Sequence, residues 1–256
     1  MKNFLFELCA ESVEAAQAAE SGGADRVELC SQLAMGGVTP SVDLIEATIQ
    51  ALSIPVHVLI RPRGGDFVFS AEEFDQMRRQ VQQAEQAGAA GVAVGVLLKD
   101  GRVDVERSGE LVRLGRRMRV TFHRAFDETR DLSEALEAVI ATGADCLLTS
   151  GGAVDVFEGA ESIARLFRQA GGRLNMMAGG GLRLANLIEV VRMTGVSYLH
   201  GSLTRRAEWE EANGLPKRNG HDAVSGPAIL EADVRESVRL LRQEFAARES
   251  ATGKGR

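Results

Sequence analysis

The sequence predicts a single (β/α)8 barrel, in which eight parallel strands alternate with helices. Short apolar runs and amphipathic segments alternate along the chain. A glycine also marks the junction of a helix with the next strand in four places: Gly23-Ala24-Asp25, Gly88-Ala89-Ala90, Gly143-Ala144-Asp145 and Gly195-Val196-Ser197. Glycine is common just past a helix because it adopts the left-handed conformation without a Cβ clash. A doubly wound open sheet is the alternative, although it would usually contain fewer strands.

Each expected strand is a short apolar run that follows a helix or the start of the chain. The runs are 4–9, 26–30, 56–61, 91–95, 119–123, 146–149, 174–178 and 198–200. Because the strands of such a barrel are parallel, their carboxyl ends meet at one mouth, where the sites of this fold lie.

The expected helices have apolar side chains at helical spacing and recognisable start signals. The segment 10–24 is rich in alanine and separates the first two strands. An apolar stripe over 74–84 follows a capping box formed by Ser70 and Glu73. Asp131 precedes the stripe over 132–140 as an N-cap, and similar stripes occur at 184–191 and 234–245.

The composition is that of a soluble globular protein and narrows the classes of partner. The 256 residues are 45% hydrophobic and 26% charged, which is enough for a large core. The net charge of −6 argues against nucleic acid or an anionic membrane surface as a partner. The three cysteines form no framework of a small disulfide-rich domain, so we expect a cytoplasmic protein.

We expect one domain over residues 1–248. The segment 203–228 after the last strand is polar and turn-rich, and it is long for a connection within a barrel. It is interpreted either as a lid or dimer arm at the barrel mouth or as a plain surface loop. Residues 249–256 are expected to form a flexible tail.

The tripeptide Glu-Leu-Cys occurs twice, at the ends of the first two expected strands. In a strand, alternate side chains share a face, so Glu7 lies on the same side as Cys9, and Glu28 on the same side as Cys30. The two strands belong to one βαβ unit and are expected to be neighbours. Two carboxylates and two thiols are therefore expected close together at the mouth.

Two thiolates on adjacent strands would suit a soft ion such as Cu(I), with help from Met176 or Met177. Cys9 and Cys30 are thus the candidate metal ligands. The alternative is that both are small buried hydrophobic residues, as free cysteines often are.

Histidines and carboxylates at the strand ends are candidates for proton transfer. His123 and His200 end their strands, and Glu7 or Glu28 could work with either of them. His57 lies earlier in its strand, so we expect it to be structural.

A group of arginines, glycines and polar residues at the same mouth predicts an anion-binding site. Arginine forks match carboxylate and phosphate groups, and backbone N–H groups of a glycine turn before a helix bind anions. The candidates are Arg61, Arg63, Arg124, Asp66, Ser150, Gly179, Gly180, Gly181 and Ser202. Two alternatives remain: the arginines could pair with Glu7, Glu28, Asp66 and Asp127 in an ionic lattice, and the glycines could form a tight turn only.

Several long motifs resemble the CutC family. They are Glu-Leu-Cys-x-x-Ser (7–12), Gly-Gly-Ala-Asp-Arg-Val-Glu-Leu-Cys-Ser (22–31), Gly-Gly-Val-Thr-Pro-Ser (36–41), Ile-Arg-Pro-Arg-Gly-Gly-Asp-Phe (60–67), Thr-Phe-His-Arg-Ala-Phe-Asp (121–127) and Leu-Thr-Ser-Gly-Gly (148–152). The resemblance implies a TIM-type barrel, a cytoplasmic location, homo-oligomers (dimer or tetramer) and copper homeostasis. If the copper role holds, the thiols that fit Cu(I) are Cys9 and Cys30.

Two functions therefore stay open at the level of sequence. One is a copper-handling protein that holds Cu(I) through Cys9 and Cys30. The other is an enzyme, such as a lyase, isomerase or aldolase, that acts on a small anionic or phosphorylated metabolite at the mouth; the fold alone selects no reaction. A third reading, an idle barrel used as an interaction scaffold, fits poorly with so many polar groups at one mouth.

Overall fold

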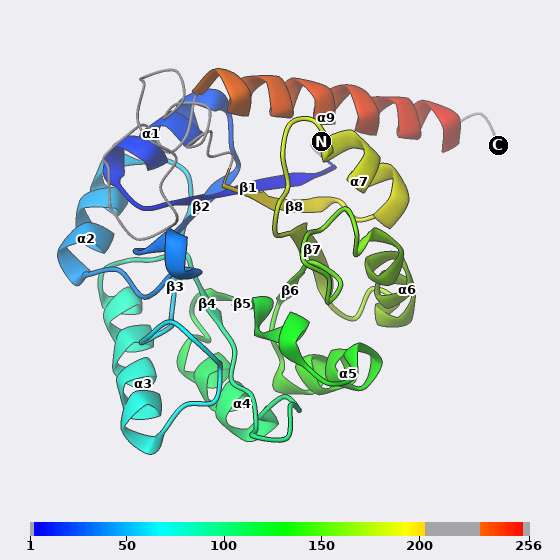
Figure 1. Ribbon diagram of the computed structural model, residues 1–256. Helices are drawn as coiled ribbons and strands as arrows, with labels where there is room; N and C mark the ends of the chain where they lie inside the picture. The colour runs from blue at the N-terminus through cyan, green and yellow to red at the C-terminus, as the bar shows by residue number, and fades with distance from the viewer. Residues whose placement is uncertain (1–2, 203–230, 253–256) are drawn as a thin grey trace, which may run out of the picture.

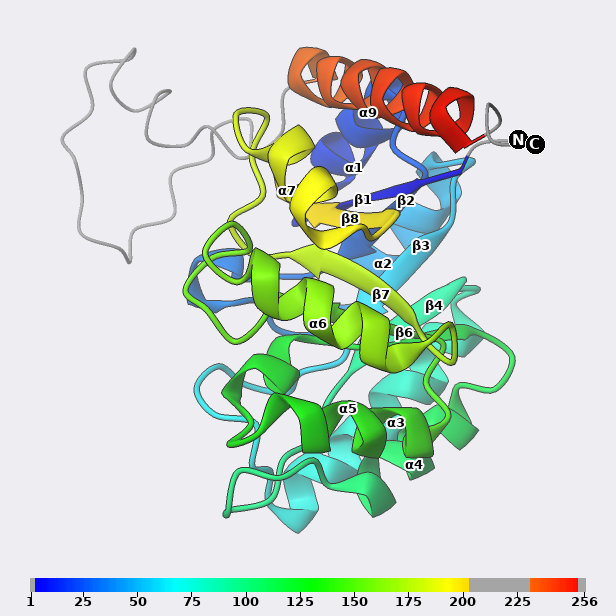
Figure 2. The ribbon, with the colours of Figure 1, turned by 90° about the vertical axis from the view of Figure 1, so that its right-hand side faces the viewer.

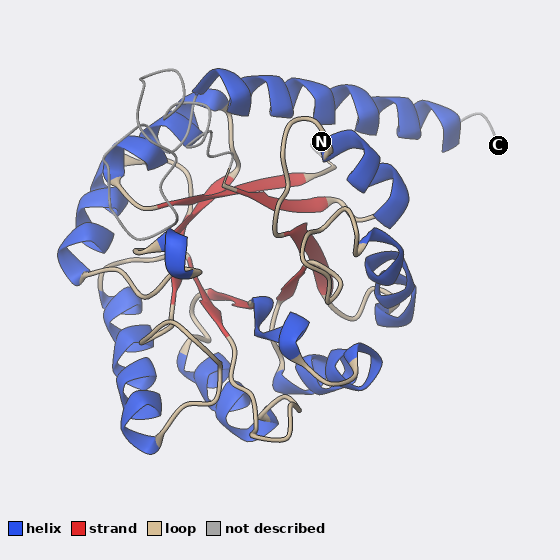
Figure 3. Cartoon of the chain, in the orientation of Figure 1, coloured by secondary structure: helices blue, strands red, loops and turns tan. Residues whose placement is uncertain are grey.

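The protein is a closed barrel of eight strands surrounded by helices (Figures 1 and 3). The computed structural model describes residues 3–202 and 231–252. Every strand pairs in parallel with its neighbours in chain order, and the last strand pairs with the first. The predicted (β/α)8 barrel is confirmed, and the open sheet is wrong because a ladder joins the two ends of the sheet.

The strands lie where the apolar runs predicted them, with ends that differ by one or two residues. They are β1 (Leu5–Ala10), β2 (Arg26–Leu29), β3 (Val56–Leu59), β4 (Gly91–Val94), β5 (Arg119–Phe122), β6 (Cys146–Thr149), β7 (Asn175–Gly179) and β8 (Tyr198–Gly201).

The helices cover most of the predicted stripes, but the helix expected from 184 begins at Leu187, so the glycine turn 179–181 does not lead directly into it. They are α1 (Val13–Gly22), α2 (Val42–Ala51), α3 (Ala71–Gln86), α4 (Val105–Leu114), α5 (Leu132–Thr142), α6 (Ala160–Ala170), α7 (Leu187–Thr194) and α9 (Glu231–Thr252), with the short 3₁₀ helices η1 (Leu33–Met35) and η2 (Arg124–Glu128). Ser70 and Glu73 form the expected capping box at α3, and Asp131 caps α5. These caps satisfy backbone N–H groups that have no partner within the helix.

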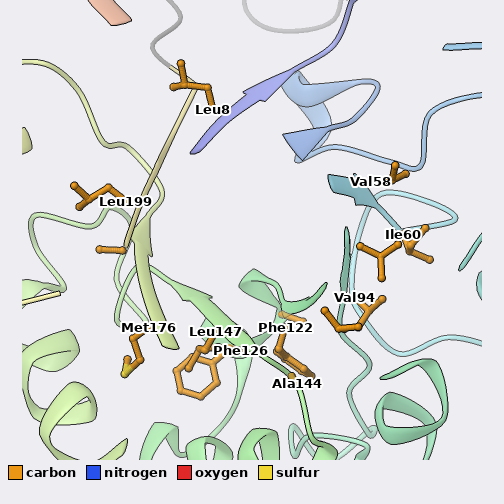
Figure 4. Close-up of a cluster of buried hydrophobic side chains, with 14 of the residues drawn as sticks. Leu8, Val58, Ile60, Val94, Phe122, Phe126, Ala144, Leu147, Met176 and Leu199 are labelled. Carbon is orange, nitrogen blue, oxygen red and sulfur yellow. The ribbon is translucent and has the colours of Figure 1, made fainter. Parts of the chain in front are cut away.

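One face of every strand packs against the helices and forms the main core. Leu8, Val58, Phe122, Leu147 and Leu199 belong to this core and lie around the ring of strands in Figure 4. Because side chains alternate along a strand, the residues between them point into the barrel.

The interior of the barrel is separate from the main core and is unusually polar. One small cluster contains Cys9, Cys30, Leu59 and Ala93, near the carboxyl ends of the strands. A second contains Cys146, Leu148 and Met177 and packs against Leu5 and Tyr198, which begin their strands. Between the two lie charged and imidazole side chains, where barrels of this fold usually place bulky apolar ones.

Glycines on neighbouring strands make room for the three interior histidines. A Cβ atom on Gly91 would lie 2.4 Å from the ring of His57, one on Gly95 would lie 2.6 Å from the ring of His123, and one on Gly179 would lie 2.9 Å from Cβ of His200. Atoms cannot approach so closely, so each histidine occupies space that a side chain on the next strand would need.

The last helix completes the outer layer beside the first one. α9 packs against α1 and α7 (Figure 2). The ring of Phe245 stacks on that of Phe4 with centroids 5.3 Å apart. The helix continues to Thr252, so residues 249–252 are helical rather than part of the expected tail. The segment 203–228, expected to be a lid, an arm or a loop, lies outside the described residues.

Within residues 3–202 and 231–252, no helix has the length and the apolar character needed to span a membrane.

Candidate functional site

Strands β1, β2 and β8 bring five of the predicted site residues together inside the barrel. Pairing places Glu7 beside His200 and Cys9 beside Glu28, and Cys30 follows β2 directly. All five side chains are buried or nearly so. The two copies of Glu-Leu-Cys therefore lie side by side, as their spacing predicted.

A buried ion pair lies at the centre of this group. The guanidinium of Arg26 donates from Nε to Oε2 of Glu7, and both side chains are less than a tenth exposed. His200 contacts the other oxygen of the same carboxylate, with 2.7 Å between Nδ1 and Oε1. Its Nε2 lies 3.8 Å from Oε2 of Glu28. Glu7 is thus held by a cation on one side and an imidazole on the other.

These contacts set different protonation states for the two carboxyls. Burial opposes the ionised form of Glu7, but Arg26 and His200 lower its pKa to about 2. Burial, together with the charge of Glu7, raises the pKa of Glu28 above its ordinary value, although His200 and Arg26 oppose this. Burial also disfavours the imidazolium of His200, yet Glu28 and Glu7 raise its pKa above the ordinary value. An ionised Glu7 is therefore adjacent to a histidine that favours its charged form.

The two thiols of the mouth lie in contact above this charged layer. The sulfur atoms of Cys9 and Cys30 are 3.1 Å apart, and both residues are free and buried. The hydrogen bond between the thiols, reinforced by burial, raises the pKa of Cys9 well above its ordinary value. One donor atom each from Cys9, Glu28 and His200 lies within 4.8 Å of the other two. The site thus offers two soft sulfurs with an oxygen and a nitrogen beside them.

Arg61 and Arg63 lie at the predicted mouth but bind the chain itself. Nη1 of Arg61 donates to the carbonyl oxygens of Gly36 and Gly37 at 3.0 and 3.1 Å, and Nη2 donates to that of Gly65. Arg63 forms ion pairs at the protein surface with Asp66 and Glu73, at 3.0 and 2.7 Å. Their donors shape the loops after β2 and β3.

Arg124, Ser150 and the glycine turn after β7 form a separate group at the mouth. Nη2 of Arg124 donates to Oγ of Ser150 at 3.0 Å. A Cβ atom on Gly180 would lie 2.8 Å from Cζ of Arg124, so the guanidinium lies directly against the glycine turn that follows β7. Ser202, half-buried, follows β8 at the same mouth.

His123 and His57 are buried, neutral histidines. Burial, with Arg61 nearby, lowers the pKa of His123 to about 3, and burial, with Arg26 nearby, lowers that of His57 to about 4. The backbone N–H of Ala125 donates to Nδ1 of His123, so the ring proton is on Nε2, and Nε2 has no partner among the described residues. His123 is at the mouth as expected, but it lies apart from the Glu7–His200 pair.

Arg26 is an interior residue that the sequence patterns above do not single out. Met177, a predicted helper of the paired thiols, lies beside Arg26 and Cys146 in the other interior cluster, apart from Cys9 and Cys30. Nη2 of Arg26 lies 3.6 Å from the sulfur of Met177, and burial raises the pKa of Cys146 to about 12. The pattern held a signal for Arg26, because it is two residues before Glu28 and shares its face of the strand. Met176 lies on the outer face, in the main core.

A separate hollow of about 740 Å³ opens at the opposite end of the barrel. Arg113, Arg116, Arg117 and Arg119 line it, together with the turns before β5 and β6. It contains none of the acid, imidazole or thiol groups of the mouth.

The fold and this site define a (β/α)8-barrel protein whose mouth holds paired thiols over a buried layer of acid, arginine and imidazole groups. Residues 4–205 match the model of the CutC family. This chain belongs to the CutC family.

Known relatives cover most of the chain. A CutC family protein of Chromobacterium violaceum is 42% identical over 243 residues, which is 93% of this chain and 97% of that protein. A human protein named copper homeostasis protein cutC homolog is 44% identical over 221 residues, which is 86% of this chain and 80% of the human protein.

Solved structures share the architecture. The crystal structure of a CutC protein from Streptococcus agalactiae is 31% identical, with a TM-score of 0.74, and the match covers 78% of this chain and all of that one (100%). A thiamine phosphate pyrophosphorylase from Pyrococcus furiosus has a TM-score of 0.59 at 16% identity over 95% of this chain and 97% of its own, which shows a common fold alone.

Proposed function

We propose that this protein takes part in copper homeostasis by binding Cu(I) through Cys9 and Cys30. The observation that carries the proposal is the contact between the two buried sulfur atoms, which are 3.1 Å apart at the end of β1 and β2. Thiolates are the ligands that Cu(I) prefers, and two can hold it in a linear or trigonal site. The names of the human and mouse relatives, both copper homeostasis protein cutC homologs, agree with this role.

The surroundings of the thiols fit a monovalent soft ion. Both cysteines lie in a small apolar cluster with Leu59 and Ala93, which keeps water away from them. Glu28 lies within hydrogen-bonding distance of Cys9 and could accept the proton that a metal must displace, since thiols bind metals as thiolates. His200 lies in the charged layer beneath the thiols, near Cys9 and Glu28, and as an imidazolium it would balance negative charge on two thiolates.

Competition with a Cu(I) chelator in the absence of oxygen tests the proposal. The parent protein is expected to bind one Cu(I), and the double variant Cys9→Ser, Cys30→Ser is expected to lose this binding. Cys146→Ser is the matched control, because Cys146 is also a buried interior thiol but lies near the start of β6, beside Met177. If the double variant competes for Cu(I) as well as the parent does, the proposal is wrong.

A second candidate is an enzyme that acts on a small anionic metabolite. The arrangement that favours it is the contact of His200 with Glu7 at 2.7 Å beside Glu28, since buried acid–imidazole groups are the usual means of proton transfer. A thermal-stabilisation screen with phosphate esters and carboxylic acids checks it, and the absence of any stabilisation would count against it. We also propose that the protein is cytoplasmic and forms homo-oligomers. Analytical ultracentrifugation measures the oligomeric state.

A further inference from the structure

Arg124 is held through one edge of its guanidinium group. Nε donates to Oδ2 of Asp127 at 2.9 Å and Nη2 donates to Oγ of Ser150 at 3.0 Å, whereas Nη1 has no hydrogen-bond partner among the described residues. The side chain of Asp127 is 7% exposed and accepts from the backbone N–H groups of Ser150 and Gly152 and from the hydroxyl of Thr149. The free edge of Arg124 is thus oriented before any ligand binds, because Asp127 and Ser150, which hold the guanidinium, follow β5 and β6 directly.

In the turn after β7, the N–H groups of Gly181 and Leu182 point away from the protein groups that bind the turn's carbonyl oxygens. The carbonyl oxygen of Gly180 accepts from the N–H of Val156 at 2.7 Å, and that of Gly181 accepts from Nδ2 of Asn186 at 3.1 Å. In a trans peptide the N–H points opposite to the C=O. The N–H of Gly181 therefore points away from Val156, and the N–H of Leu182 points away from Asn186.

Neither of these two N–H groups has a hydrogen-bond partner among residues 3–202 and 231–252. Gly181 is exposed and Leu182 is buried, so an external acceptor can reach the first N–H group from the mouth, and a partner for the second would offset the cost of burying a backbone donor. Gly180 and Gly181 have φ angles of 98° and 76°, which other residues rarely adopt, so the turn keeps this shape only with glycine.

The free guanidinium edge and the free N–H groups are adjacent. Nη1 of Arg124 would lie 3.0 Å from a Cβ atom on Gly180, so the guanidinium covers the first residue of the turn. From this arrangement we propose that Arg124 and the turn Gly180–Leu182 bind a phosphate group, either inorganic phosphate or a phosphomonoester. This site is independent of the thiols of β1 and β2.

Phosphate fits these donors better than a carboxylate does. Its oxygens are arranged as a tetrahedron, so one can accept from Nη1 of Arg124 while others accept from the two N–H groups of the turn. A carboxylate has two oxygens in one plane and would leave a donor without a partner. Ser150 is a positioning residue here, because its hydroxyl holds Nη2 of Arg124 and needs no contact with the ligand.

Titration of the ¹⁵N-labelled protein with inorganic phosphate and with methyl phosphate, at constant ionic strength, tests this site. We expect saturable shifts of the Gly181 and Leu182 amide signals, with a dissociation constant of about 1 mM or lower for at least one of the two. Tighter binding of methyl phosphate would identify a phosphomonoester as the ligand, and tighter binding of inorganic phosphate would identify the free ion. Acetate is expected to give no saturable shift of these signals.

Substitution of Arg124 tests whether phosphate binding depends on its guanidinium or on the turn alone. Arg124→Gln is expected to weaken phosphate binding at least about tenfold, since it removes a charge-assisted hydrogen bond. Arg63→Gln is the matched control, because Arg63 lies at the same mouth but is paired with Asp66 and Glu73. Arg124→Lys keeps the charge but loses the fork of N–H donors, so its phosphate affinity is expected to be intermediate. This variant replaces Arg124→Gln in the test if the glutamine variant folds poorly.

Two results would overturn the inference. One is the absence of saturable shifts at Gly181 and Leu182 with either probe up to about 20 mM. The other is an equal loss of affinity in the Arg124 and Arg63 variants. The copper proposal stands or falls separately: the Cys9→Ser, Cys30→Ser variant should bind phosphate like the parent, and Arg124→Gln should bind Cu(I) like the parent.

Discussion

Replacing Glu7 with glutamine tests whether the buried ion pair stabilises the barrel interior. The carboxyl pKa falls from an ordinary 4.5 to about 2 in the folded protein. This difference of roughly 2.5 in pKa corresponds to about 3 kcal/mol, and little is lost to solvent screening because both partners are buried. Removing one member of a buried pair also leaves the charge of Arg26 uncompensated, which costs a similar amount in other proteins, roughly 3–5 kcal/mol. We therefore expect Glu7→Gln to lower the free energy of unfolding by about 3 kcal/mol at pH 7.

Chemical denaturation of Glu7→Gln beside a matched surface variant gives the measurement. Glu137→Gln is the control, because Arg173 and Gln169 also lower the pKa of Glu137 to about 2, although that pair is about half exposed. Solvent screens an exposed pair, so the control is expected to change stability little. Since the folded pKa of Glu7 is lowered, its contribution is complete above pH 4.5 and decreases as the pH falls toward 2; the difference between parent and Glu7→Gln should narrow there. Equal costs for the two variants at pH 7 would refute the reasoning.

Two further predictions concern the interior histidines. His57 and His123 have pKa values lowered from 6.5 to about 4 and about 3, so below pH 6.5 the unfolded chain takes up protons that the folded protein excludes. Stability should therefore fall by about 2 kcal/mol per histidine between pH 8 and pH 5, measured by urea denaturation, and NMR titration of either ring near 6.5 would contradict this. Gly91→Ala would place a Cβ atom 2.4 Å from the His57 ring. It should cost about 1–3 kcal/mol in the parent and less in a His57→Ala background, as a double-mutant cycle would show; an unchanged cost would exclude this contact as the cause.

The architecture was predictable because it depends on patterns that neighbouring residues share. Glycines such as Gly23 and Gly143 take the expected left-handed conformation after their helices. The apolar runs coincide with strands because burial on the outer face of the barrel requires apolar side chains there. The gathering of Glu7, Cys9, Glu28 and Cys30 also follows from parallel neighbours whose inward residues alternate. The register that sets Cys9 beside Glu28 and Glu7 beside Arg26 does not follow from the sequence.

The use of each charged side chain was not predictable, because it depends on contacts between loops. Arg61, Arg63 and Arg124 are predicted to share one anion site, yet Arg61 and Arg63 spend most of their donors on the chain itself. Among the described residues, Nη1 of Arg124 and the buried Nε of Arg61 keep no partner. The carbonyls that hold Arg61 belong to glycines of two sequence motifs, but a motif does not show that its backbone oxygens face a particular arginine. For Arg26 the strand alternation indicates an inward side chain, but an arginine inside a barrel is costly, and its acceptor, Glu7, is identified only by the three-dimensional structure.

Closure of the ring has a consequence for biosynthesis. Glu7 and His200 are 193 positions apart, and β1 gains its second neighbour only when β8 arrives. Because the chain is made from its amino terminus, one edge of β1 stays unpaired until most of the polypeptide has left the ribosome. The inward faces of β1 and β2, which carry the acids and thiols, stay exposed for the same time. The nascent chain has Cys9 and Cys30 early but acquires the imidazole beside them late. Any ion captured before that moment would meet two sulfurs without their histidine neighbour.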